Sequence, residues 1–177
     1  MIYIITPCSR PENLVAISKT IPSECKWIVV HDNKTHVVPI YNATFLVCDD
    51  TGPVGTIARN YALDTLPLVD NDLILFHDDD NIIHPSWYTT ISQHLHIDFS
   101  IMTWGQINKN QTVRLLPTMY PEIGNIDTAC FLVRWKYNKE VRHGFFYEHD
   151  GLFAQTCAKN GRIVCINDYL CYYNYLR

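Results

Sequence analysis

The chain has 177 residues, of which 47% are hydrophobic and 18% charged, which is the composition of a folded globular protein and not of a disordered one. Its formal net charge of −4 argues against a protein that coats nucleic acid, because such proteins are usually basic. It has no apolar run long enough to cross a bilayer, no signal-peptide pattern and no CxxC pair among its seven cysteines, so we expect one soluble, cytoplasmic domain over residues 1–177.

The first half of the chain alternates between strand-like and helix-like composition. Strand-like segments are β-branched or aromatic runs that stop at Pro, Asp or Asn, and helix-like segments repeat apolar residues at intervals of three or four. In chain order they are strand 1–6, helix 10–21, strand 26–32, strand 43–50, helix 55–66 and strand 72–80.

The second half continues with helix 85–95 and the strands 99–107 and 111–117. Residues 128–135 (TACFLVRW) fit a strand or a helix equally well. A helix over 149–161 ends at Gly161, and a last strand covers 162–168. Alternation of strands and helices predicts a three-layer α/β/α, Rossmann-like fold with a mostly parallel central sheet.

Three of the predicted strands end in acidic residues, at Asp32, at Asp49 with Asp50, and at residues 78–80. Ligands of open parallel sheets bind at the carboxyl ends of the strands. The active edge of the sheet is therefore expected to be acidic. Such an edge suits a metal ion, and it suits a phosphorylated ligand if a metal bridges the two.

The triplet Asp78-Asp79-Asp80 lies in the stretch FHDDDNIIHPSW. In an extended chain Asp78 and Asp80 point to one side and Asp79 to the other. Two carboxylates on one side suit Mg²⁺ or Mn²⁺, while the alternative is a solvated turn that uses aspartate for capping. An isolated DxD is a weak motif, and its position between LILF and NIIHPSW makes it more specific.

The stretch DLILFHDDDNIIHPSWY resembles the DxD segment of glycosyltransferases of the GT-A fold. Its DDDN is similar to that of the animal glucuronyltransferases, and the inverting family-2 transferases share the general pattern. IYIITPCSRPENL, IVVHDN, GTIARNYAL and FFYEHDGLFAQTCAKNGRIVCIND resemble further segments of this group, in the same order. The late motif departs from the pattern, because it reads Glu148-His149-Asp150 instead of a Glu-Asp pair, and the chain is short for the group.

The resemblance implies a metal site and a nucleotide-sugar site. The metal ligands would be Asp80 and Asp78, with His149 as a third ligand to the metal or the pyrophosphate, and the metal would bridge both phosphates of the donor. The nucleotide-sugar site would comprise Pro7, Ser9, Arg10, Asp32, Arg59, Asp78, Asp79, Trp104 and Asp127.

Within that site Asp78 or Asp79 would bind the ribose, and Asp32 would accept from the N3–H of uracil. Arg59 would contact a phosphate or orient Asp78, and Trp104 would stack on a sugar. Each has a structural alternative: Asp32 a turn, Arg10 and Arg59 solvated surface charges, Trp104 a core position and Asp127 a helix cap.

Sugar transfer with inversion needs one general base to deprotonate the acceptor hydroxyl. Asp150 is the first candidate and Glu148 the second, although a carboxylate at a helix N-terminus is also a good cap.

The sequence thus predicts a glycosyltransferase dependent on Mn²⁺ or Mg²⁺ that moves a sugar from a UDP-sugar to a glycan or glycoprotein acceptor, with inversion. Its N-terminal half would bind the nucleotide, and its C-terminal half the acceptor. The alternatives are a retaining transferase, a catalytically inactive sugar-binding domain and a nucleotidyltransferase. The last would normally carry a Gly-rich, basic loop after the first strand, which TPCSRPENL lacks.

Overall fold

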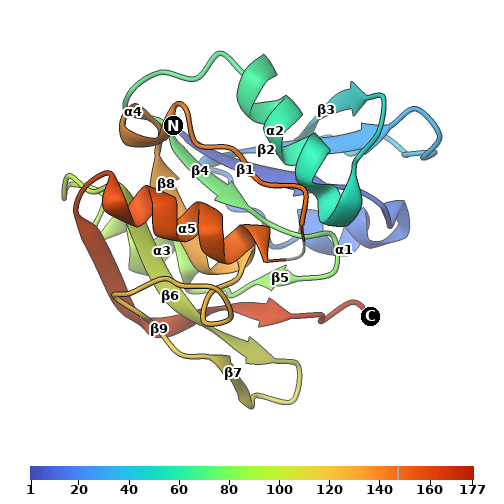
Figure 1. Ribbon diagram of the computed structural model, residues 1–177. Coiled ribbons are helices and arrows are strands. Elements are labelled where there is room, and N and C mark those ends of the chain that lie inside the picture. The colour runs from blue at the N-terminus through green and yellow to red at the C-terminus, as the bar shows by residue number, and fades with distance from the viewer. Residues whose placement is uncertain (147) are drawn as a thin grey trace.

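The computed structural model describes residues 1–146 and 148–177, so Tyr147 in the late acidic motif lies outside the described residues. The strands are β1 Ile2–Pro7, β2 Cys25–Asp32, β3 Ala43–Cys48, β4 Leu73–Phe76, β5 Ile82–Ile83, β6 Ile101–Asn108, β7 Val113–Leu115, β8 Phe131–Arg134 and β9 Ile163–Tyr173 (Figure 1). The α-helices are α1 Leu14–Ser18, α2 Thr56–Thr65, α3 Trp87–Ser92, α4 Trp135–Asn138 and α5 His149–Lys159. Short 3-10 helices cover Pro11–Asn13, Pro53–Gly55 and Thr128–Cys130.

In the described part of the chain the strands form one nine-stranded sheet, ordered β3-β2-β1-β4-β8-β6-β9-β5 with β7 beside β6. Strands β1 to β4 pair in parallel, as do β6 and β9. Strand β8 runs antiparallel to both of its neighbours, and β5 and β7 are also antiparallel to theirs. The sheet is therefore mixed, and the prediction of a mostly parallel sheet is correct only for its N-terminal half. Apolar runs reveal strands but not their direction.

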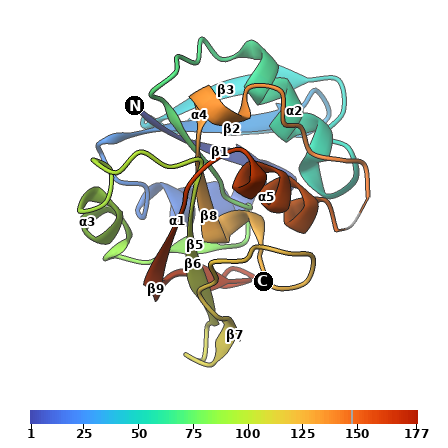
Figure 2. The ribbon, with the colours of Figure 1, turned by 60° about the vertical axis from the view of Figure 1, so that its left-hand side comes forward.

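Helices cover both faces of the sheet, as the three-layer prediction requires (Figures 1 and 2). Alternate residues of β1 face opposite sides, so Ile4 joins the core cluster that contains α1 and α3, while Ile5 joins the cluster that contains α2 and α5. All four residues of β4 are buried, because this strand lies between the two clusters.

Several predicted elements differ in extent from the structure, and three of them affect the site or the sheet. The strand expected over 72–80 ends at Phe76, and a backbone hydrogen bond from Asn81 N to Asp78 O (3.2 Å) turns the acidic triplet away from the sheet. The ambiguous residues 128–135 contain a 3-10 turn and then β8. The last strand runs on to Tyr173. Among the described residues, no helix is long and apolar enough to cross a membrane.

Candidate functional site

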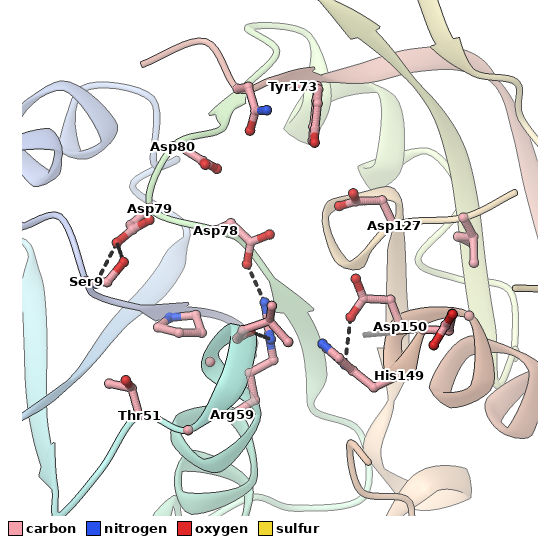
Figure 3. A pocket seen from close by; sticks show the side chains of 18 of the residues that line it. Ser9, Thr51, Arg59, Asp78, Asp79, Asp80, Asp127, His149, Asp150 and Tyr173 are labelled. Carbon is pink, nitrogen blue, oxygen red and sulfur yellow. Dashed lines mark hydrogen bonds and ion pairs between the residues drawn. The ribbon is translucent and has the colours of Figure 1, made fainter. Parts of the chain in front are cut away.

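A cavity of about 440 Å³ lies where β1 and β4 end and α5 begins. Loops from both halves of the chain meet there (Figure 3). Its lining includes Pro7, Cys8, Ser9 and Arg10 after β1, Thr51, Gly52, Val54, Gly55 and Arg59 around the start of α2, Asp78, Asp79 and Asp80 after β4, Arg114, Ile123, Gly124 and Asp127, Glu148, His149, Asp150 and Gly151 around the start of α5, and Tyr173, Asn174 and Arg177.

Asp79 holds the loop after β1 in place. Its carboxylate accepts hydrogen bonds from Ser9 N (2.6 Å), Ser9 Oγ (3.0 Å) and Arg10 N (2.7 Å), and it pairs with Arg10 Nη1 at 2.6 Å. Asn13 Nδ2 also donates to the Asp79 backbone carbonyl (2.8 Å). Asp80 also pairs with Arg10 Nη1, so Asp79 and Asp80 do not point to opposite sides as they would in an extended chain. The carboxylate of Asp79 is fully engaged with the protein.

Asp78 faces the middle of the cavity. Its Oδ1 pairs with Arg59, whose side chain is buried under the cavity, and Arg59 Nη1 also donates to Val54 O (2.6 Å). Its Oδ2 receives one long hydrogen bond from Thr128 Oγ1 (3.4 Å). One oxygen of Asp78 is thus fixed by an arginine, and the other is weakly bonded.

Asp80 is buried between two arginines. Its Oδ2 lies 2.8 Å from Arg10 Nη1 and 2.6 Å from Arg177 Nε. Burial and the negative charge of Asp78 raise the pKa of this carboxyl, although both arginines act in the opposite direction.

Asp127 and Arg114 form the wall of the cavity that faces Asp78. Arg114 Nη1 donates to Asp127 Oδ2 (2.9 Å) and to Gln106, and the guanidinium lies 3.5 Å from the centre of the Tyr173 ring. Burial, together with the charges of Asp78 and Asp150, raises the pKa of Asp127 to about 6. As Figure 3 shows, Asp127 and Asp150 point towards Asp78 across the cavity.

The first turn of α5 brings the late acidic motif to the cavity. Glu148 is exposed, whereas Asp150 is half-buried and His149 is buried. Asp150 Oδ1 lies 2.8 Å from His149 Nδ1, and His149 Nδ1 lies 2.9 Å from Nδ1 of the buried His143. His149 is thus packed with His143 and Asp150, which differs from its predicted place beside Asp80.

The loop before α2 is shaped by glycines. Gly55 has a φ of +77°, and a Cβ added there would lie 2.7 Å from Pro7 Cβ. Gly52 also has a positive φ, of +73°. Glycine is the residue that adopts this backbone conformation at little cost, so GPVG can close against the loop after β1.

Two predicted site residues do not line the cavity. Asp32 caps a turn, where its Oδ1 accepts from Lys34 N, Thr35 N and Thr35 Oγ1. Trp104 is buried in the core, where its Nε1 donates to Ala129 O (2.9 Å) and its ring packs edge-on against Trp87. The structural alternatives for these two residues are the ones observed.

Sequence reasoning missed several cavity residues, notably Arg114, Tyr173, Arg177 and, behind the cavity, His143. Arg114 lies within a predicted strand, and none of the four belongs to a recognisable motif. They reach the site only because segments from the second half of the chain fold beside the ends of β1 and β4.

The residues present fit a divalent cation of the Mg²⁺ or Mn²⁺ type. Asp78 and Asp80 offer hard carboxylate oxygens to one cavity, which are the ligands these ions prefer. Burial raises the pKa values of Asp80 and Asp127, and repulsion from neighbouring carboxylates, chiefly Asp78, raises them further; a cation would relieve that repulsion. Arg177, which now pairs with Asp80, has 57% of its side chain exposed and can move into solvent.

The sequence matches no protein-family model and no curated protein. Among solved structures, the fold is that of a group of nucleotidyltransferases. A protein from Bacillus anthracis assigned as a glucose-1-phosphate thymidylyltransferase matches with a TM-score of 0.56 and 13% identity, over 93% of this chain and 85% of its own.

Two further structures agree. The inositol-1-phosphate CTP transferase from T. maritima matches with a TM-score of 0.51 and 14% identity, over 97% of this chain and 87% of its own. The 2-C-methyl-D-erythritol 4-phosphate cytidylyltransferase from Francisella tularensis matches with a TM-score of 0.53 and 13% identity, over 96% and 92%.

These likenesses establish a shared Rossmann-like fold and correct the functional prediction. These three structures are named as nucleotidyltransferases and not as glycosyltransferases, so the prediction of a sugar-transferring enzyme is wrong by this comparison. The DxD pattern misled because an acidic pair after an apolar strand serves any enzyme that holds metal-bound phosphates at a sheet edge.

Proposed function

We propose that the chain is a nucleotidyltransferase that moves the nucleotidyl group of a pyrimidine nucleoside triphosphate to a small polyhydroxylated phosphate ester. The observation that supports it most is the placement of the cavity within this fold. It lies at the carboxyl ends of β1 and β4, with acidic residues in the middle and arginines on both sides. The three similar enzymes are named for glucose-1-phosphate, inositol-1-phosphate and 2-C-methyl-D-erythritol 4-phosphate, and for thymidylyl, CTP or cytidylyl donors.

In this reaction a phosphate oxygen of the acceptor attacks the α-phosphorus of the triphosphate. A new P–O–P bond forms, the bond between the α-phosphorus and its bridging oxygen breaks, and pyrophosphate leaves with the electron pair. The attacking phosphate is already ionised near neutral pH, since its second pKa is about 6. The reaction therefore needs no general base, and Asp150 and Glu148 are not required in that role.

Arginines on both sides of the cavity would hold the two anionic substrates. Arg10 and Arg177 lie on the β1 side, where the triphosphate would bind, and Arg114 lies on the opposite wall, where it can take the phosphate of the acceptor. A divalent cation held by Asp78 and Asp80 would neutralise charge on the phosphates.

The groups that bind the phosphates would differ from the backbone amides that a Gly-rich loop provides. Backbone N–H groups of Ser9 and Arg10 are occupied by Asp79, so they are not available to a phosphate. Residues 7–9 and the GPVG loop remain to contact the base and ribose. TPCSRPENL lacks the Gly-rich pattern of a phosphate-binding loop, and in this proposal arginine guanidinium groups bind the phosphates in place of backbone amides.

The test is a release assay for pyrophosphate. The protein would be incubated with Mg²⁺, with each of CTP, UTP, dTTP, ATP and GTP, and with glucose-1-phosphate, inositol-1-phosphate or 2-C-methyl-D-erythritol 4-phosphate. We expect pyrophosphate and a nucleoside diphosphate ester, detected by mass, with at least one pyrimidine donor. Asp80→Asn should lower the rate about a hundredfold or more, and Asp32→Asn, outside the cavity, should leave it unchanged.

Absence of pyrophosphate with every pair would contradict the proposal. Release of UDP from UDP-sugars in the same preparation would contradict it directly, because that product requires cleavage of the sugar–phosphate bond.

A further inference from the structure

Behind the cavity, three side chains converge on one point. One ring nitrogen of His143, one ring nitrogen of His149 and one carboxylate oxygen of Asp150 all lie within 4.8 Å of one another. The two nitrogen atoms are 2.9 Å apart, and His149 Nδ1 is 2.8 Å from Asp150 Oδ1. His143 comes from the segment before α5, and the other two residues are the first of that helix.

Protons alone do not satisfy this cluster. The hydrogen bond between the two Nδ1 atoms uses one proton and one lone pair. Asp150 Oδ1 is close to His149, but it is not aligned with a donor, and it is buried without a hydrogen-bond partner among the described residues. The same holds for His143 Nε2. Buried polar atoms are rarely left unpaired, so the cluster calls for an explanation.

The geometry of His143 is fixed before any ligand arrives. Its ring stacks on Phe153 with centroids 4.1 Å apart, and Phe76 packs edge-on at 4.6 Å. Asn60 pins the backbone, because its Oδ1 accepts from His143 N and its Nδ2 donates to His143 O, both at 2.9 Å. Burial, the charge of Arg59 and the neighbouring His149 hold the pKa of His143 well below its ordinary value, so its imidazole is neutral at pH 7.

We propose that His143, His149 and Asp150 bind a divalent transition-metal ion of the Zn²⁺ or Co²⁺ type, at a site separate from Asp78 and Asp80. Two imidazole nitrogens and one carboxylate oxygen form a ligand set that such ions favour over Mg²⁺. Tetrahedral ligands about 2.1 Å from a metal are about 3.4 Å apart, so the His143–His149 and His149–Asp150 pairs, at 2.9 Å and 2.8 Å, need to open by about 0.5–0.6 Å.

The surroundings allow an ion to enter and to remain. Asp150 and His149 both line the cavity, which gives a path from solvent and leaves a fourth ligand position to water or to a substrate. Arg59, whose charge acts on His143, is paired with Asp78, so its charge is compensated. Metal bound here would fix the start of α5 to the segment of His143.

The experiment uses the full chain, stripped of metal with EDTA and then dialysed. Zn²⁺ is titrated by calorimetry in the presence of millimolar Mg²⁺, which occupies the hard oxygen site, and Co²⁺ binding is followed by its visible absorption. We expect one equivalent of Zn²⁺ and a d–d band from bound Co²⁺. His149→Asn and Asp150→Asn should each weaken Zn²⁺ binding at least tenfold, whereas Asp78→Asn and the exposed His36→Asn should not.

Two results would overturn the proposal. One is a wild-type protein that binds no stoichiometric Zn²⁺ or Co²⁺, and the other is binding that survives in both His149→Asn and Asp150→Asn. Near-ultraviolet circular dichroism checks that the variants are folded, and Asp150→Asn is nearly isosteric at a half-buried position, so at least one variant reports on binding. The readout is metal affinity, and it is independent of whether nucleotidyl transfer occurs.

Discussion

Asp79 and Asp80 are neighbours in the sequence and share Arg10 Nη1, but their carboxylates differ in the other groups around them. Asp79 receives three hydrogen bonds and an ion pair from the loop after β1, so its carboxylate holds that loop in place. Asp80 meets burial and the repulsion of Asp78, which together raise the pKa of its carboxyl. Asp79 therefore has a structural role. The ionised form of Asp80 is disfavoured in the folded protein, and a bound cation would stabilise it.

Replacing each by asparagine should separate these roles. Asp79→Asn turns an amide N–H₂ towards the donors Ser9 N and Arg10 N, and we expect a loss of about 1–3 kcal/mol in the free energy of unfolding. Asp80→Asn removes a charge that the folded state disfavours, so the metal-free protein should lose no stability, while Mg²⁺ should no longer strengthen nucleotide binding. Urea unfolding and nucleotide calorimetry with and without EDTA measure both effects. Equal destabilisation by the two variants would contradict the assignment.

At the scale of elements, helix α5 depends on a close approach at its first turn. A Cβ on Gly151 would lie 2.5 Å from Ile123 Cα and 2.8 Å from Ile123 N. These are backbone atoms of the segment that forms one wall of the cavity, so they cannot move aside as a side-chain tip can. Gly151 thereby sets how near Asp150 lies to Asp127 and Asp78.

Gly151→Ala tests this contact, because the contact predicts a loss of stability where helix propensity alone predicts a gain. In a free helix, alanine is better than glycine by about 1 kcal/mol. Here we expect a net loss of about 1–3 kcal/mol, because the helix must shift away from residues 122 and 123. Chemical unfolding measures it, and Lys159→Ala, exposed in the last turn of the same helix, is the control with little change. A more stable Gly151→Ala protein would show that the packing is loose.

The sequence was sufficient for elements whose signal is local. The apolar runs of β1, β2 and β4 and the spacing of α2 and α5 are visible in the residues themselves, and so is the acidic end of β4. The antiparallel direction of β8 was not visible, because an apolar run such as FLVR gives no sign of which way the strand runs in the sheet. The two halves of the extended β9 were also hard to join, since Asn167 and Asp168 interrupt its apolar pattern.

The site was predictable where chain order determined proximity. The loop after β1 and the turn after β4 follow adjacent parallel strands, so Ser9, Arg10 and Asp79 had to meet. Asp32 ends the next strand along the sheet, yet its oxygen is occupied by its own turn. Arg114 and His143 reach the site only through the packing of the second half of the chain, for which no periodic pattern provides a signal.

At the scale of the whole molecule, buried titratable groups give stability a dependence on pH in two senses. Burial lowers the pKa of His77 to about 4, and the ordinary value in the unfolded chain is 6.5. Asp127 shifts the opposite way, from 3.8 to about 6. Because of the His77 shift, the free energy of unfolding decreases as pH falls below 6.5. Because of the Asp127 shift, it decreases as pH rises from 3.8 to 6.

The contribution of His77 can be isolated as a difference between two proteins. Between pH 7.5 and pH 5 the unfolded chain takes up a proton on this histidine and the folded chain does not, so wild type should lose about 2 kcal/mol of unfolding free energy through this group. His77→Gln keeps a donor for Asn81 O, to which His77 Nε2 is 3.2 Å distant, and cannot titrate. Its stability should therefore fall by about 2 kcal/mol less than that of wild type over the same range.

Urea unfolding in EDTA at pH 7.5, 6.5, 5.5 and 5 measures this difference. Asp127 is present in both proteins, so its opposing contribution cancels, and so do those of the other buried histidines. The exposed His36→Gln serves as the matched control and should follow wild type at every pH. Parallel curves for wild type and His77→Gln would mean that His77 becomes protonated in the folded protein as readily as in the unfolded chain. That outcome would place water or a compensating charge beside a side chain that the structure shows buried at the end of β4, 1% exposed.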